Sequence, residues 1–165
     1  MERQVNASGI PAAFVRPDVF MANDLAWAPS IRQTGTVKLA YPGAATTPID
    51  ERDIAAVAAH ALINRTENTA YEITGPESLT QAERVNTLAG VLGHPIELVE
   101  IAPEEAALDL QESMPAEAAM FLLNSLRART EEPAIPNDTI QHATGTPAHN
   151  YREWATNRRA AFSPR

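Results

Sequence analysis

The fold of this chain is decided by residues 12–23, which read AAFVRPDVFMAN. Residues 12–16 are mostly apolar and stop at Pro17, which is typical of a short buried strand ended by a proline. The residues that follow mix apolar and polar side chains, and they indicate loop and short helix over residues 21–31, a segment that carries Trp27. The sequence therefore predicts a short strand and a mostly irregular connection after it.

Strands and helices continue to alternate beyond this stretch. Asp50 can cap a helix that has Asp53 in its first turn, and Thr80 forms a capping-box pattern with Glu83 before a helix that stops at Gly93. Other strands are expected over residues 35–41, 69–74 and 96–101, and other helices over residues 2–8, from residue 103, from residue 115 and over residues 151–162. This order predicts an α/β fold class.

Composition limits the possible partners. The 165 residues, 44% of them apolar, are enough for one domain with a core. The formal net charge of -8 argues against nucleic acid and anionic membranes, because both need basic surfaces. The absence of cysteine excludes disulfides and thiolate metal sites. The longest apolar run, Ile54 to Ile63, is too short to span a bilayer, and no apolar signal segment opens the sequence, so we expect a cytoplasmic protein.

Five short motifs stand in a fixed order along the chain. They are Ser8-Gly9 before Phe14-Val15-Arg16-Pro17, Phe20-Met21-Ala22-Asn23, Asp50 before Arg52-Asp53-Ile54-Ala55-Ala56-Val57-Ala58, Thr74-Gly75-Pro76-Glu77, and Gly145-Thr146-Pro147-Ala148 before Trp154-Ala155. In this order they resemble the NmrA-like, atypical short-chain dehydrogenases, and the resemblance runs from about residue 2 to residue 162. The order of the motifs makes the resemblance specific, since none of them is specific alone.

The resemblance implies the C-terminal part of a dinucleotide-binding protein: a truncated Rossmann-like sheet remnant plus a small helical substrate-binding lobe. We expect one domain over residues 1–165, in which residues 1–93 form the remnant and residues 94–165 form a lobe that is not independent. In this family the loop after the Arg-Pro pair passes beside the nicotinamide and the substrate. By analogy, the residues expected to line the pocket are Pro17, Asp18, Val19, Phe20, Met21, Asn23 and Trp27.

The family's nucleotide-binding motifs have no counterpart in these residues. A dinucleotide needs a Gly-rich turn that opens a helix, and the seven glycines form neither G-x-G-x-x-G nor G-x-x-G-x-x-G. The family's Tyr-x-x-x-Lys pair is missing too, because no tyrosine lies four residues before Lys38, the only lysine. Family members usually carry Gly where Asp18 stands, and a carboxylate sits badly beside a reduced nicotinamide and its phosphates. We therefore expect no bound cofactor, or NADP only if a partner chain supplies the missing half.

Two carboxylates are candidates for chemistry. Asp18 and Asp24 flank the apolar side chains of Phe20, Met21 and Trp27, and apolar surroundings raise the pKa of a carboxyl group towards the range of a general acid or base. The alternative is that Asp24 caps a short helix and Asp18 forms a turn. Three functions stay open: a cofactor-independent enzyme that isomerises, dehydrates or cyclises a hydrophobic small molecule, a split or truncated NAD(P)H-dependent reductase, and a non-catalytic binding or regulatory module.

Three further expectations concern surfaces and the core. A strand over residues 13–16 without its upstream neighbours has an open parallel edge, which a second copy of the chain, as a homodimer, or a partner chain should cover. The spacing of His60, His94, His142 and His149 does not favour a metal site. Buried positions are expected at Ile54, Val57, Ala58, Ala61 and Leu62 on one helix and at Met114, Met120, Phe121 and Leu122 in the lobe.

Overall fold

The computed structural model describes residues 2–163. Its strands are β1 (Ala13–Pro17), β2 (Thr36–Leu39), β3 (Ala45–Thr46), β4 (Thr69–Ile73), β5 (Leu79–Thr80) and β6 (Glu97–Glu100). Its helices are α1 (Glu2–Ala7), the 3-10 helix η1 (Met21–Trp27), α2 (Ala28–Thr34), α3 (Glu51–Ile63), α4 (Gln81–Leu92), α5 (Pro103–Gln111), α6 (Ala116–Glu131), α7 (Thr139–Thr144), α8 (Tyr151–Asn157) and α9 (Arg159–Phe162). The predicted α/β class is confirmed.

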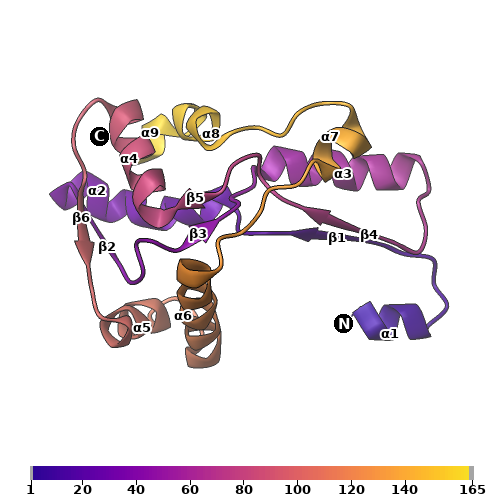
Figure 1. The fold of residues 1–165 in the computed structure, drawn as a ribbon, viewed down its shortest axis with the longest axis horizontal. Coiled ribbons are helices and arrows are strands. Elements are labelled where there is room, and N and C mark those ends of the chain that lie inside the picture. Colours follow the sequence, from indigo (N-terminus) through magenta and orange to yellow (C-terminus); the bar gives the residue numbers. More distant parts are fainter. Residues whose placement is uncertain (1, 164–165) are drawn as a thin grey trace.

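The described strands pair two by two. β1 and β4 run parallel, from Ala13 opposite Thr69 to Pro17 opposite Ile73. β2 and β6 are also parallel, whereas β3 and β5 are antiparallel. Figure 1 shows the β1–β4 pair at one end of the molecule, with α3 and α7 on one side of it and α1 on the other. The parallel pairs joined through helices match a partial Rossmann-like fold, as expected.

The largest core cluster lies away from the β1–β4 pair. Tyr151, Trp154 and Phe162 are almost fully buried there, and they pack with Leu88 of α4 and Met21 of η1. Stacking of the rings of Tyr151 and Trp154, whose centroids are 5.4 Å apart, adds to this packing. The C-terminal helices thus share one core with elements from the first half of the chain. The proposed division of the single domain at residue 93 stays a prediction.

The predicted helix ends are confirmed where local chemistry sets them. The carboxylate of Asp50 accepts a hydrogen bond from the backbone N–H of Arg52 at the start of α3. Thr80 and Glu83 form the capping box of α4, which ends at Gly93 with φ 83°. The helix predicted over residues 151–162 is instead two helices, because the backbone at Arg158 leaves the helical region. The part of the chain that the structure describes contains no helix long and apolar enough to cross a membrane.

The prediction of burial is wrong for three residues: Leu62, Met120 and Phe121 are exposed. Met120 is 50% exposed and Phe121 is 75% exposed, because α6 packs mainly on α5 and β3 and buries only the side of the helix that carries Ala119 and Leu123. Leu62 is 79% exposed in the last turn of α3, whose buried side ends at Ala61. Met120 and Phe121 are therefore not among the buried core residues of the described part of the chain.

Candidate functional site

The carboxyl ends of β1 and β4 lie side by side, and the loop after β1 is held there by backbone hydrogen bonds. The N–H of Asp18 donates to the carbonyl of Ile73 at 3.1 Å. The carbonyl of Val19 accepts from the N–H of Ile49 at 2.8 Å, and the N–H of Met21 donates to the carbonyl of Ile49 at 2.9 Å. Ligands of open α/β sheets bind outside the carboxyl ends of the strands. This end of the β1–β4 pair is therefore the candidate site.

Asp18 is tied to the neighbouring segment. Its Oδ2 accepts hydrogen bonds from the backbone N–H of Thr47 at 2.9 Å and from the Thr47 hydroxyl at 2.5 Å. Thr47 is fully buried, so the carboxylate faces two fixed donors. This contact links the loop after β1 to the segment that contains Thr47, 29 residues further along the chain, so it is not a local turn contact. An acid or base role for Asp18 stays a prediction.

Gly75 allows the segment 47–49 to approach the end of β4. A Cβ atom at this position would lie 1.7 Å from the carbonyl oxygen of Pro48, so no other residue fits without a backbone shift. The N–H of Gly75 donates to the carbonyl of Thr47 at 3.2 Å. Close backbone packing at the site thus explains the glycine of the Thr-Gly-Pro-Glu motif.

The expected lining residues have different environments. Phe20 is 41% exposed and Asn23 is exposed, so both are accessible to a ligand. Pro17, Val19 and Trp27 are half-buried. Met21 is fully buried, and its side chain packs in the largest core cluster. The substrate contacts assigned to these residues stay predictions.

Asp24 belongs to a buried polar cluster. Its carboxylate accepts hydrogen bonds from Nη1 of Arg84 at 2.7 and 3.0 Å and from the hydroxyl of Tyr151 at 2.6 Å. Asp24, Arg84 and Tyr151 are each at most 3% exposed. The guanidinium of Arg84 also lies over the ring of Trp27, 5.3 Å from its centroid. The cluster connects η1, α4 and α8.

Burial raises the pKa of Asp24 to about 6, while the charge of Arg84 and the Tyr151 hydroxyl act in the opposite direction. Burial, together with Asp24, raises the pKa of Tyr151 as well. Both oxygens of Asp24 accept hydrogen bonds and its side chain is closed off from solvent, and an acid or base role for this carboxylate stays a prediction. The sequence reasoning did not include Arg84, although the residue falls on the apolar side of α4 with Val85 and Leu88, which was a usable signal.

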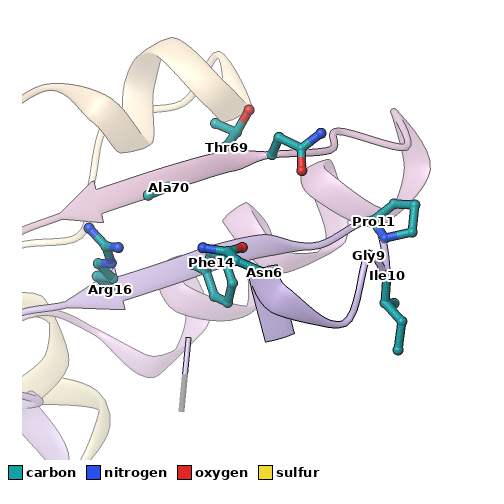
Figure 2. A pocket seen from close by; sticks show the side chains of 9 residues that line it. Asn6, Gly9, Ile10, Pro11, Phe14, Arg16, Thr69 and Ala70 are labelled. Carbon is teal, nitrogen blue, oxygen red and sulfur yellow. The ribbon is translucent and has the colours of Figure 1, made fainter. Parts of the chain in front are cut away.

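A hollow of about 370 Å³ lies beside β1, between that strand and α1 (Figure 2). Phe14 and Arg16 of β1 line it together with Ile10. Arg16 forms ion pairs with Glu2 of α1 and Glu72 of β4 across this side of the strands. The side of the β1–β4 pair opposite α3 is therefore covered only in part by the described residues.

The outer edge of β1 carries unpaired backbone groups. The N–H of Asp18 points to β4, and backbone groups alternate in direction along a strand, so those of Ala13, Val15 and Pro17 point away from β4. Proline has no N–H, which leaves the two donors of Ala13 and Val15. No described strand pairs with this edge. Such an edge accepts a further strand.

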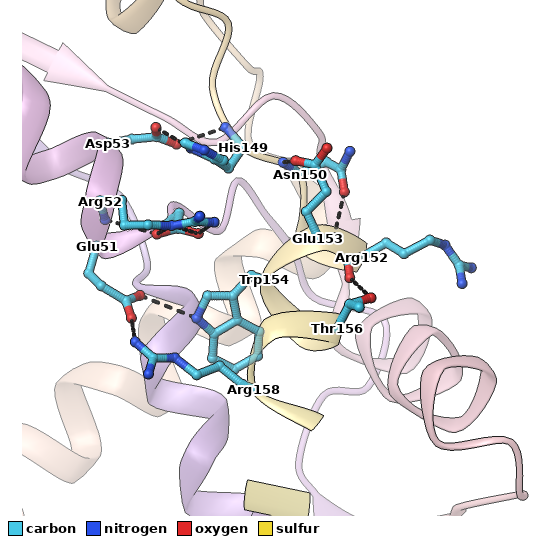
Figure 3. Close-up of polar contacts among 11 residues, drawn as sticks. Glu51, Arg52, Asp53, His149, Asn150, Arg152, Glu153, Trp154, Thr156 and Arg158 are labelled. Atoms are coloured by element: carbon cyan, nitrogen blue, oxygen red, sulfur yellow. Dashed lines mark hydrogen bonds and ion pairs between the residues drawn. The ribbon is translucent and has the colours of Figure 1, made fainter. Parts of the chain in front are cut away.

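A second polar cluster holds the C-terminal segment against α3 (Figure 3). Asp53 accepts from the backbone N–H of His149 at 2.8 Å and lies 2.7 Å from its Nδ1. Glu51 accepts from the indole of Trp154 at 3.2 Å and pairs with Arg158. These contacts fasten the segment that carries α8. Within residues 2–163, no group of side chains has the composition of a metal site.

The geometry of the glycines bears on cofactor binding. Gly9, Gly35, Gly93 and Gly145 have φ values between 71° and 83°, and each follows the end of a helix. A pyrophosphate instead needs a Gly-rich turn at the start of a helix. Among the described residues, these four glycines therefore form no Gly-rich turn at the start of a helix.

The chain is similar in sequence to several known proteins. No family model matches it. It is 40% identical over 99% of its length to (4-alkanoyl-5-oxo-2,5-dihydrofuran-3-yl)methyl phosphate reductase of Streptomyces griseus, of which it covers 58%. It is 35% identical over 98% of its length to an NAD(P)H azoreductase of Xenophilus azovorans, of which it covers 57%.

A solved structure supports the same fold. An NADPH-dependent quinone oxidoreductase of Escherichia coli, in complex with NADPH, matches 94% of this chain and 56% of its own with a TM-score of 0.79 at 21% identity. The chain spans about half the length of the curated relatives it matches. These matches identify the chain as a relative of the NmrA-like, NAD(P)-binding reductases, aligned to about half of their length as expected for their C-terminal part.

Proposed function

We propose that this chain forms the substrate-side part of an NAD(P)H-dependent reductase that acts on a hydrophobic small molecule. The observation that carries the proposal is the alignment of nearly the whole chain, at 40% identity, with a reductase. The second curated relative is a reductase as well. In this proposal the carboxyl ends of β1 and β4 form the substrate side of the reductase site. The nucleotide would be held by a Gly-rich turn outside the described residues.

The loop after β1 would contact the substrate. Phe20 and Asn23 offer an apolar and a polar accessible surface, and Val19 and Trp27 add half-buried apolar surface. Asp18 would position this loop through Thr47, and Asp24 would hold η1 from the core through Arg84. In this proposal the two carboxylates shape the pocket and do not transfer protons.

The nucleotide-holding polypeptide would pair with the outer edge of β1. The N–H groups of Ala13 and Val15 provide donors for a parallel strand, and the hollow beside Phe14 provides space for an apolar side chain of that polypeptide. Parallel strands are normally buried on both faces, which favours continuation of this sheet. A homodimer that covers the same edge is the competing arrangement.

The two other functions receive less support from the geometry. A cofactor-independent isomerase, dehydratase or cyclase would rely on Asp18, since Asp24 is closed off from solvent by its partners. Unchanged turnover in Asp18→Asn would remove that mechanism. A non-catalytic binding module would keep the same pocket without turnover.

Reconstitution of NADPH binding tests the proposal. NADPH fluorescence is titrated with this chain alone, with the unmatched front part of the Streptomyces griseus reductase alone, and with their mixture. We expect tight binding only in the mixture. Val15→Pro removes one outward N–H and no hydrogen bond to β4, so it should weaken the mixture's binding, whereas Val15→Ala keeps the N–H and serves as the matched control.

Two results would contradict the proposal. Micromolar NADPH binding by the chain alone would show that no second polypeptide is needed. A mixture that forms no complex, or a stable homodimer that Val15→Pro dissociates, would show that the edge of β1 is not the place of the nucleotide-binding half.

A further inference from the structure

The helix η1 is unusually long for a 3-10 helix. It runs for seven residues, from Met21 to Trp27, and no side chain caps its start. Stretches of 3-10 helix longer than about three or four residues are uncommon, because their hydrogen bonds have poorer geometry than those of an α-helix, and they often mark a hinge. Contacts with the rest of the fold must therefore hold η1 in this form.

Two polar contacts hold η1, one at its start and one in its middle. At the start, the N–H of Met21 donates to the carbonyl of Ile49 at 2.9 Å. In the middle, the buried cluster around Asp24 joins η1 to α4 and α8. Phe20 and Asn23, the accessible side chains of the loop, are each next to one of these contacts in the sequence, and the N–H of Asn23 donates to the carbonyl of Phe20 at 3.1 Å. A change in the cluster therefore acts directly on the accessible part of the loop.

The cluster depends on the charge of Asp24. Among the described residues, the carboxylate of Asp24 is the only acidic group paired with the guanidinium of Arg84, and Nε of Arg84 is buried without a hydrogen-bond partner. Protonation of Asp24 leaves the cation of Arg84 buried without a counter-charge, which is unfavourable. The long side chain of Arg84 can then turn its guanidinium towards solvent. The buried arrangement is therefore favoured only while Asp24 is ionised.

The surroundings of Asp24 place its proton uptake in mild acid. Burial raises the pKa of Asp24 to about 6, against the opposing effects of Arg84 and of the Tyr151 hydroxyl. No other charged side chain lies on η1, and on the other helices packed against η1, Arg32 of α2 and Arg159 of α9 donate to backbone carbonyls elsewhere. Between pH 6 and the ordinary 3.8, the folded chain binds a proton that the unfolded chain does not. Acidification therefore stabilises the fold through this group, and the structural change it causes is local.

We propose that the cluster around Asp24 is a pH-dependent switch. At neutral pH the ionised cluster holds η1 in its 3-10 form. Proton uptake by Asp24 in mild acid frees Arg84 and shifts η1 together with Phe20 and Asn23. The inference does not rest on the proposed reductase function, because the switch is measured on the chain without substrate or cofactor.

Two-dimensional amide NMR spectra of the full chain, recorded from pH 8 to pH 5, test the switch. The backbone signals of Phe20 and Asn23 and the indole signal of Trp27, whose ring lies against the cluster, should move in one transition centred near pH 6. Asp24→Asn keeps the shape of the side chain but cannot ionise, so the transition should be absent and the signals should stay at their acidic positions. Glu105→Gln removes an exposed carboxylate and should leave the transition unchanged. Circular dichroism checks that each variant keeps its helices.

Two further variants identify the titrating group even if Asp24→Asn does not fold. Tyr151→Phe removes a hydrogen bond that stabilises the ionised carboxylate, so the midpoint should rise by about one pH unit. His149→Gln removes the histidine that precedes α8 and contacts Asp53, and it should leave the midpoint unchanged.

Four results would overturn the inference. The signals of Phe20 and Asn23 could stay fixed between pH 8 and pH 5, or their transition could persist in Asp24→Asn. Loss of the transition in His149→Gln would assign the titration to the histidine. An unchanged midpoint in Tyr151→Phe would show that the titrating group lies outside the cluster.

Discussion

The cluster around Asp24, Arg84 and Tyr151 and the β1–β4 pair are opposite kinds of structure in one chain. The cluster is enclosed on all sides by packed side chains such as Trp154 and Leu88. All five residues of β1 are only partly buried or exposed, and in β4 only Ile73 is buried. Within the described residues, the cluster has all its polar groups enclosed by the fold, whereas the β1–β4 pair keeps an edge and a side open for contact.

Removal of Arg84 is expected to have the largest effect, because it breaks the closed region. Arg84→Met leaves the carboxylate of Asp24 buried without its cation, and breaking a buried pair in this way costs about 3–5 kcal/mol of the free energy of unfolding. Urea denaturation at neutral pH measures the loss. Lys38→Met removes a cation from the exposed pair with Glu105, and it should cost less than about 1 kcal/mol.

The loss in Arg84→Met should depend on pH. The pKa of Asp24 is already raised to about 6, and loss of Arg84 raises it further. A raised pKa in the folded state contributes stability that is present when the group is protonated and lost as the pH rises. The deficit of the variant should therefore grow above pH 6 and shrink below it. A loss of stability that is the same above and below pH 6, or no larger than that of Lys38→Met, would show that the buried pair stabilises the fold no more than an exposed pair.

Gly75→Ala is expected to cause the next largest loss of stability. Gly75 lies at the end of β4, where the β1–β4 pair meets the segment 47–49. The added Cβ would lie 1.7 Å from the carbonyl oxygen of Pro48, and relief of such overpacking costs about 1–3 kcal/mol. Gly43→Ala is the matched control, because a Cβ at Gly43 meets nothing within 4 Å. Thermal unfolding of both variants measures the difference, and equal midpoints would show that the strand ends are not tightly packed.

Local signals predicted much of the fold from the sequence. The cap at Asp50, the capping box at Thr80 and the C-terminal glycine at Gly93 are each decided by a few neighbouring residues, so their helices were predicted correctly. The two-residue strands β3 and β5 were not predicted, because they depend on pairing between residues that are distant in the sequence: Ala45 pairs with Thr80, which is 35 positions away, and Thr46 pairs with Leu79, which is 33 positions away. Apolar spacing also misplaced Phe121, since spacing does not reveal whether another element covers that side of α6.

The site was predicted only in part, because its contacts also join residues that are distant in the sequence. The motif order located the loop after β1, and the structure places Phe20 and Asn23 of that loop at the surface. The partner of Asp24 is Arg84, which is 60 residues away, and its hydroxyl donor is Tyr151, which is 127 residues away. Only packing of η1, α4 and α8 brings these side chains together, so the burial of Asp24 and its two partners could not be predicted from neighbouring residues.

Removal of the cap at Asp50 is expected to have the smallest effect, because a single helix cap contributes little stability. It concerns the open region, since α3 packs against β1. Asp50→Ala should cost about 1 kcal/mol, and Thr80→Ala should cost a similar amount at α4 in the closed region. Amide hydrogen exchange separates the two variants. Faster exchange should be confined to α3, β1 and β4 in the first variant and should include α4 and α8 in the second. Identical exchange patterns would show that the two regions unfold as one unit.

The contribution of Asp50 should also disappear in acid. Burial pushes the pKa of Asp50 upward, but hydrogen bonds from the side chain and backbone of Arg52 outweigh it and hold the pKa below the ordinary 3.8. A lowered pKa in the folded state contributes stability that is present above the unfolded value and lost as the pH falls through the folded one. The difference in unfolding free energy between the wild type and Asp50→Asn should therefore be constant near neutral pH and shrink below pH 3.8. A difference that persists unchanged in acid would mean that the shape of the side chain, and not its charge, caps α3 over the open pair.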